Sequence, residues 1–208
     1  MKHTLFILML FLTGLSNAQT VTIGNQVWMT KNLDVATFRN GDPIPEAKSN
    51  EEWEKAGENK QPAWCYYDND PANGEKYGKL YNWYAVNDKR GLTPVGYHIP
   101  SDADWTKLTD FLGGEEVAGT KMKSKSGWGY NDGESDNGTN ESGFSGLPGG
   151  WRNLYGSFSS IGVYGEWWSS TKYGANHAYY RSLSSSQGHV SRYGSVKAEG
   201  CSVRCIKD

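Results

Sequence analysis

Hydrophobic and polar residues alternate in several separate runs of the chain, with the two-residue period of a β-strand that buries one face. In the first run, residues 21–29, two β-branched or aromatic stretches flank Gly24-Asn25, a pair that favours the tight turn of a hairpin. Three later runs predict an antiparallel sheet that closes the domain: residues 166–171, 178–183 and 201–206.

Two segments carry the start signals of helices. Ser49 is followed three residues later by Glu52, the spacing of a capping box, which predicts a short helix. The clearest helix covers residues 102–112, because Ser101 can accept a hydrogen bond from the backbone amide of Asp104. We expect the apolar side chains of this helix to share one face that packs on the core: Trp105, Leu108, Phe111 and Leu112.

Residues 125–165 consist mostly of Gly, Ser, Asn and Asp with single aromatic residues between them, and no apolar period persists there. This composition predicts a long structured loop region. The whole pattern therefore predicts one α+β domain, in which a few helices pack on twisted antiparallel sheets beside a long loop region.

The first eighteen residues have the pattern of a secretory signal peptide. Lys2 precedes an apolar run over residues 5–12, and Ser16-Asn17-Ala18 places small residues where a signal peptidase cuts. The apolar run is too short to span a bilayer. We therefore expect residues 19–208 to be one exported domain without a membrane anchor, located in the periplasm, on the cell surface or outside the cell.

Composition adds two points to this picture. The chain has 9 Trp and 13 Tyr, which supply large buried areas, and 26 Gly, which suit many turns. Its formal net charge is −2 with both signs interspersed, whereas binding to nucleic acid needs clustered Lys and Arg. We expect no nucleic-acid partner.

Six segments resemble a known family, and they follow one another along nearly the whole exported part: residues 28–34, 77–83, 96–105, 143–150, 167–171 and 202–205. They include Trp167-Trp168-Ser169-Ser170-Thr171 and Ser202-Val203-Arg204-Cys205. In these segments the chain resembles the Fibrobacter succinogenes major paralogous domain family of exported bacterial proteins. The resemblance implies a C-type-lectin-like fold, distantly akin to the formylglycine-generating enzymes. It implies no particular activity.

The predicted loop region contains a candidate calcium site, because oxygen-bearing side chains of the type that calcium prefers lie close together in sequence. These residues are Asp132, Glu134, Asp136 and Asn140. C-type-lectin-like folds often hold calcium in their long loop region, so the resemblance favours the same segment. The alternative is an ordinary solvated loop, and calcium stays a candidate cofactor.

Sugar binding is a second candidate activity. Classical C-type lectins read sugars through a calcium ion held by Glu-Pro-Asn or Gln-Pro-Asp and a Trp-Asn-Asp strand, and this chain has Gln61-Pro62-Ala63 without that strand. The calcium-dependent sugar site therefore does not carry over. Exposed rings can still stack on a glycan, and the candidates are Trp151, Tyr155 and Tyr164.

An enzyme is a more distant alternative. Formylglycine-generating enzymes hold copper with two cysteines near the chain end, and Cys201 with Cys205 is superficially similar, but with three intervening residues where that family has four. The sequence has no Gly-x-Ser-x-Gly or His-Glu-x-x-His motif, and its histidines are isolated. We expect no catalytic activity.

Three cysteines, in a compartment where disulfides persist, predict one pair and one odd thiol. Relatives commonly place cysteines where this chain has Cys65 and Cys205, so the resemblance implies a bond between these two. Cys201 and Cys205 in one extended strand would lie about 13 Å apart, too far for a disulfide. The predicted bridge is therefore Cys65–Cys205, with Cys201 left free.

Together these observations predict an exported, non-catalytic binding or adhesion module whose partner is an extracellular protein or a glycan. The first alternative is a glycan-binding lectin-like protein. The second is a copper-dependent oxidase related to the formylglycine-generating enzymes.

Overall fold

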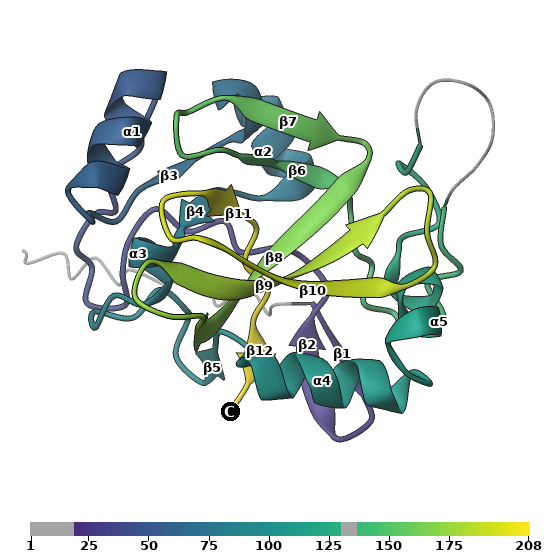
Figure 1. Ribbon diagram of the computed structural model, residues 1–208. Helices are drawn as coiled ribbons and strands as arrows, with labels where there is room; N and C mark the ends of the chain where they lie inside the picture. The colour runs from purple at the N-terminus through teal and green to yellow at the C-terminus, as the bar shows by residue number, and fades with distance from the viewer. Residues whose placement is uncertain (1–18, 130–136) are drawn as a thin grey trace, which may run out of the picture.

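The computed structural model describes residues 19–129 and 137–208 (Figure 1). Helices in this part of the chain are α1 (Asn50–Glu58), the 3₁₀ turn η1 (Tyr67–Asn69), α2 (Pro71–Tyr77), α3 (Trp83–Val86), α4 (Asp102–Phe111) and α5 (Glu115–Met122). Strands are β1 (Thr20–Ile23), β2 (Gln26–Met29), β3 (Trp64–Cys65), β4 (Leu80–Asn82), β5 (Tyr97–His98), β6 (Gly149–Arg152), β7 (Phe158–Ile161), β8 (Tyr164–Lys172), β9 (His177–Ser184), β10 (Val190–Val196), β11 (Gly200–Cys201) and β12 (Ile206–Lys207).

Two sheets organise the fold. The smaller sheet has the strand order β1-β2-β12-β5, and the larger has the order β10-β9-β8-β6-β11-β4-β3, with β7 paired to β6. Most neighbours are antiparallel, and β6 runs parallel to β8. Helices α4 and α5 lie beside β8, β9 and β10 (Figure 1). The predicted α+β class, with a few helices on mainly antiparallel sheets, is confirmed.

Several local predictions are also confirmed. Strands β1 and β2 form the expected hairpin, and Gly24 in its turn has a φ of 62°, which glycine adopts without strain. A complete capping box starts α1, in which the Ser49 hydroxyl accepts from the Glu52 amide. Helix α4 starts in the same way, with Ser101 accepting from Asp104.

One residue that the sequence predicts on the buried face of α4 is exposed in the structure. Trp105, Leu108 and Leu112 are buried as expected, but Phe111 is 64% exposed. At 100° per residue, position 111 falls well to the side of the other three. Its ring lies instead beside Gly24 of the β1–β2 turn.

Two sequence predictions about irregular and extended segments are wrong. Residues 149–161, assigned to the long loop, form the hairpin of β6 and β7, whose turn is closed by a hydrogen bond from Ser157 to Asn153. Residues 201–206, predicted as one strand, divide between two sheets. Cys201 pairs with β4 in the larger sheet, whereas Ile206 pairs with β2 and β5 in the smaller one.

Tryptophan dominates the interior. Six indole side chains are completely or almost completely buried: Trp28, Trp53, Trp83, Trp105, Trp167 and Trp168. One cluster lies among β1, β2, α4, α5 and the inner side of β8 and β9, and two others fill the rest of the domain. Because each ring removes a large apolar area from water, these residues stabilise the fold rather than offer ligand surfaces.

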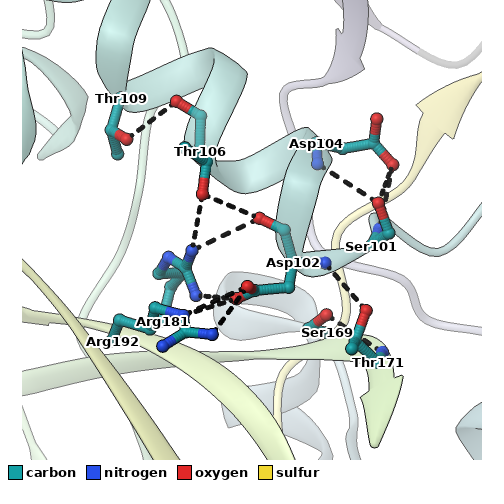
Figure 2. Close-up of polar contacts among 9 residues, drawn as sticks. All are labelled: Ser101, Asp102, Asp104, Thr106, Thr109, Ser169, Thr171, Arg181 and Arg192. Carbon is teal, nitrogen blue, oxygen red and sulfur yellow. Dashed lines mark hydrogen bonds and ion pairs between the residues drawn. The ribbon is translucent and has the colours of Figure 1, made fainter.

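A polar network fastens the start of α4 to the larger sheet (Figure 2). Asp102 accepts from the Arg181 Nη1 at 2.6 Å and from both Nε and Nη2 of Arg192 at 2.9 Å. Its backbone amide donates to the hydroxyl of Thr171 at 3.0 Å. The helix start is therefore bound to β8, β9 and β10 at once.

Candidate functional site

The face of β8, β9 and β10 that points away from α4 presents a row of polar and aromatic side chains. Side chains alternate between the two faces of a strand. Glu166 therefore lies on the same face as Ser182 of β9 and Ser191 of β10, to which the register joins it. The next row on this face runs from Trp168 through Tyr180 to Tyr193.

A cleft of about 420 Å³ opens over this face, within the usual size range of small-ligand sites. We call it the serine–tyrosine cleft. Its lining residues are Trp151, Ser160, Tyr164, Glu166, Tyr180, Ser182, Ser184, Gln187, Ser191, Tyr193, Ser195 and Glu199. The lining contains four aromatic rings, five hydroxyl-bearing serines, one amide and two carboxyl groups, with no Lys, Arg or His.

Glu166 is the most deeply buried charged residue of the cleft, at 8% exposure. Burial, together with the charge of the nearby Glu199, raises the pKa of its carboxyl group to about 8. Its carboxylate oxygen accepts a weak contact from the thiol of Cys201 at 3.9 Å. At neutral pH this side chain is therefore mostly a neutral carboxylic acid, which can both donate and accept hydrogen bonds.

Glu199 lies on the connection between β10 and β11 and reaches the same cleft. The hydroxyl of Ser195 donates to one of its oxygens. Burial raises the pKa of Glu199, against the opposing effects of that hydrogen bond and of His177. Two acids of raised pKa thus stand in one cleft.

Aromatic rings border these acids. The Tyr180 and Tyr193 ring centroids lie 5.9 Å apart, and Tyr180 also meets the buried Trp168 edge to face at 6.1 Å. Trp151 comes from β6 and Tyr164 from the start of β8. Ring faces beside hydroxyl and carboxyl groups suit a ligand with both apolar faces and many hydroxyl groups.

The cleft contains two of the three rings proposed from the sequence. Trp151 and Tyr164 are brought together there, although 12 residues of chain lie between them. Tyr155 lies in the β6–β7 turn, 63% exposed and outside the lining. Sequence reasoning missed Glu166 and Tyr180 as site residues, although both lie within the strands predicted over residues 166–171 and 178–183.

Of the candidate calcium ligands, Asp132, Glu134 and Asp136 lie outside the described residues. Asn140 is described, and its amide group is engaged with Ser145: the side-chain oxygen accepts from the backbone amide at 2.8 Å and the nitrogen donates to the hydroxyl at 2.9 Å. Within residues 19–129 and 137–208, no three His, Cys, Asp or Glu side chains are grouped to hold a metal ion.

The predicted Cys65–Cys205 disulfide is not formed in the structure, where all three cysteines are free and buried. Cys65 packs with Leu80, its partner across β3 and β4, whereas Cys205 packs with Tyr81 in a different cluster. Leu80 and Tyr81 point to opposite faces of β4, so the two thiols lie on opposite sides of the sheet. This separation follows from strand pairing that the sequence does not show.

The burial of the cysteines also matters for the question whether Cys201 and Cys205 could bind copper. Cys201 and Cys205 are both inaccessible, and burial raises the pKa of both thiols, to about 12 for Cys205. A reactive or metal-binding thiol instead needs an accessible environment that favours the thiolate. The geometry here is that of structural cysteines.

Nothing among the described helices is both long and apolar enough to cross a membrane. The family model of the Fibrobacter succinogenes major domain matches residues 21–207. No curated protein matches the chain, and no solved structure does.

Proposed function

From the premise that the chain belongs to the Fibrobacter succinogenes major domain family, we propose that it is an exported, non-catalytic binding module that takes a glycan in the serine–tyrosine cleft. Export is supported by the signal-peptide pattern of residues 1–18, and the proposed fold relationship is to the C-type-lectin-like proteins. The partner is accordingly an extracellular or cell-surface carbohydrate.

One observation carries the proposal: the cleft joins four aromatic rings to hydroxyl, amide and carboxyl groups that can exchange hydrogen bonds with sugar hydroxyls. The non-catalytic role follows from the family, which implies no particular activity, and from the sequence, which has no Gly-x-Ser-x-Gly or His-Glu-x-x-His motif.

The test is a glycan screen with purified residues 19–208, followed by affinity measurements on three variants. Trp151→Ala and Tyr164→Ala remove rings from the cleft, and we expect each to weaken binding at least about tenfold, since stacked aromatic contacts are major contributors to such sites. Tyr155→Ala removes a ring that is exposed but lies outside the cleft. Its binding should equal that of the unchanged protein.

Equal losses in all three variants, or none in any, would contradict the cleft as the binding site. A screen without any bound glycan would contradict the glycan proposal itself. Incubation of a bound glycan with the protein should leave the glycan intact by mass spectrometry, and release of shorter products would show that the module is an enzyme.

A further inference from the structure

The chemical class of the ligand can be narrowed further from the charges in the serine–tyrosine cleft, and this step rests on the proposed function. The lining contains two acids and no base. Within residues 19–129 and 137–208, the side chain of Glu166, at 8% exposure, has a polar contact with one side chain, the neutral thiol of Cys201. By contrast, the partly buried Asp102 on the other side of the sheet is held by two arginines.

A buried carboxyl group without a cationic partner is unfavourable in its charged form, since nothing replaces the lost hydration. The groups that face Glu166 are Glu199, Cys201 and Tyr180, and each of them is neutral or negative. His177 opposes the rise in the pKa of Glu199 and is not among the groups that shift the pKa of Glu166. Among the residues that the structure describes, no cation therefore faces Glu166, and the open side of Glu166 is the cleft.

The aromatic rings favour the same kind of occupant. A ring face attracts a cation, and recognition of ammonium groups by several rings together with carboxylates is a recurrent arrangement. Tyr180 and Tyr193 pack against one another in the row next to Glu166, and Tyr164 precedes it on the same strand face. Serine hydroxyls line the same cleft as the acids and the rings.

We propose that the ligand of the cleft carries a cationic amine, and that it is an amino sugar whose free ammonium group is received by Glu166 and Glu199. The ammonium group donates hydrogen bonds to the two carboxylates, while the sugar hydroxyls meet the serines. Because Glu166 is largely protonated in the empty cleft, it gives up its proton to solvent as the ammonium group enters.

The experiment compares two oligosaccharides of equal length by calorimetry at pH 6: an oligomer of glucosamine and the matching oligomer of N-acetylglucosamine, which has the same rings but no charge. We expect the glucosamine oligomer to bind at least about tenfold more tightly. Its binding heat should vary with the ionisation heat of the buffer, because a proton is released.

Substitutions distinguish binding in the cleft from general electrostatic attraction between the protein and a cationic ligand. Glu166→Gln and Glu199→Gln should each abolish the preference for the free amine. Glu58→Gln removes the same charge from an exposed position and should keep the preference. A thermal melt of each variant checks that it is folded.

Equal binding of the two oligomers, tighter binding of the acetylated one, or an unchanged preference in Glu166→Gln would overturn the inference and leave the glycan proposal standing. Failure of both oligomers to bind would also overturn it. The wider glycan screen then decides the proposed function separately.

Discussion

Burial sets the chemistry of Glu166 more strongly than any neighbouring group does. The side chain is 8% exposed and its pKa is raised to about 8 from an ordinary 4.5. In the unfolded chain the same group ionises near its ordinary value. The folded state therefore holds a proton that the unfolded state releases between these two pH values.

This difference predicts the effect of Glu166→Gln on stability. Because the folded pKa is the higher one, the stability associated with Glu166 is fully present below about pH 4.5 and decreases as pH rises to 8. Each pKa unit corresponds to about 1.4 kcal/mol, so the decrease is on the order of 4 kcal/mol. Glutamine resembles the neutral acid and does not ionise, so the variant should be the more stable protein at pH 8.

Urea unfolding at pH 5 and pH 8 measures this difference, with Glu58→Gln as the control at an exposed position. The unchanged protein and the control should both lose stability over this range, and Glu166→Gln should lose much less. Equal losses in all three proteins would contradict a buried, protonated Glu166.

The cysteines give a second prediction at the scale of residues. All three are buried and free, and burial raises the pKa of each thiol. A thiol reagent should therefore react very slowly with the native protein and should titrate three thiols after unfolding without a reductant. Detection of one thiol, with a linked peptide containing Cys65 and Cys205, would show that the disulfide predicted from the family resemblance exists.

Among the elements, the attachment of α4 to the sheet depends on one carboxylate. Asp102 stands between Arg181, which is completely buried, and Arg192 (Figure 2). Burial opposes its ionisation, but hydrogen bonds from Arg192 and Arg181 outweigh this effect and hold the pKa of Asp102 below its ordinary value. Removing the carboxylate leaves the guanidinium of Arg181 without a counter-charge.

We therefore expect Asp102→Ala to lower the free energy of unfolding by about 3 kcal/mol, the cost of breaking one side of a buried ion pair. Ser101→Ala, which removes the helix cap and the hydroxyl's contact with the Asp104 carboxylate, should cost about 1 kcal/mol. Asp110→Asn, at an exposed position of the same helix, should change stability by less than about 0.5 kcal/mol. Denaturant unfolding at pH 7 measures all three, and a cost for Asp102→Ala no greater than that for Asp110→Asn would contradict the role of the network.

The sign of the pH dependence follows from the lowered pKa of Asp102. Its contribution is present above the unfolded value near pH 4 and is lost as pH falls through the folded value. The difference in stability between the unchanged protein and Asp102→Ala should therefore shrink below pH 4. A difference that stays constant down to pH 2 would show that the ion pairs do not cause it.

At the scale of the whole molecule, the chain end joins segments that are far apart in sequence. Ile206 of β12 pairs with Trp28 of β2 and with His98 of β5, and it is 4% exposed. The preceding residues leave the larger sheet after Ser202, which still bridges to Trp167 of β8. The last eight residues therefore belong to both sheets.

Shortening one side chain tests this connection. Ile206→Ala should lower the free energy of unfolding by about 3 kcal/mol, because it opens a cavity where three strands meet. Lys207→Ala, in the same strand but exposed, should change it by less than about 0.5 kcal/mol. Thermal and denaturant unfolding report both, and equal effects would mean that β12 contributes little to cohesion between the sheets.

The sequence by itself determined the features that depend on residues close together along the chain. The β1–β2 hairpin, the capped starts of α1 and α4, and the strands over residues 166–171 and 178–183 follow from turn chemistry, side-chain caps and a two-residue period, all of which act within a few positions. The α+β class follows from the same signals. Resemblance to the family extended this to nearly the whole domain, in agreement with the matching family model.

Tertiary structure alone decided the rest, because pairing between distant strands sets which side chains share a face. Strand β10 has no apolar period, and it becomes a strand only through its register with β9. That register brings Glu166 and Tyr193 to one cleft, adds Trp151 from β6, and leaves Tyr155 outside. Strand pairing also separates Cys65 from Cys205 across the sheet. The pattern along the chain shows which side chains of one strand share a face. It does not show which distant strand pairs with that strand.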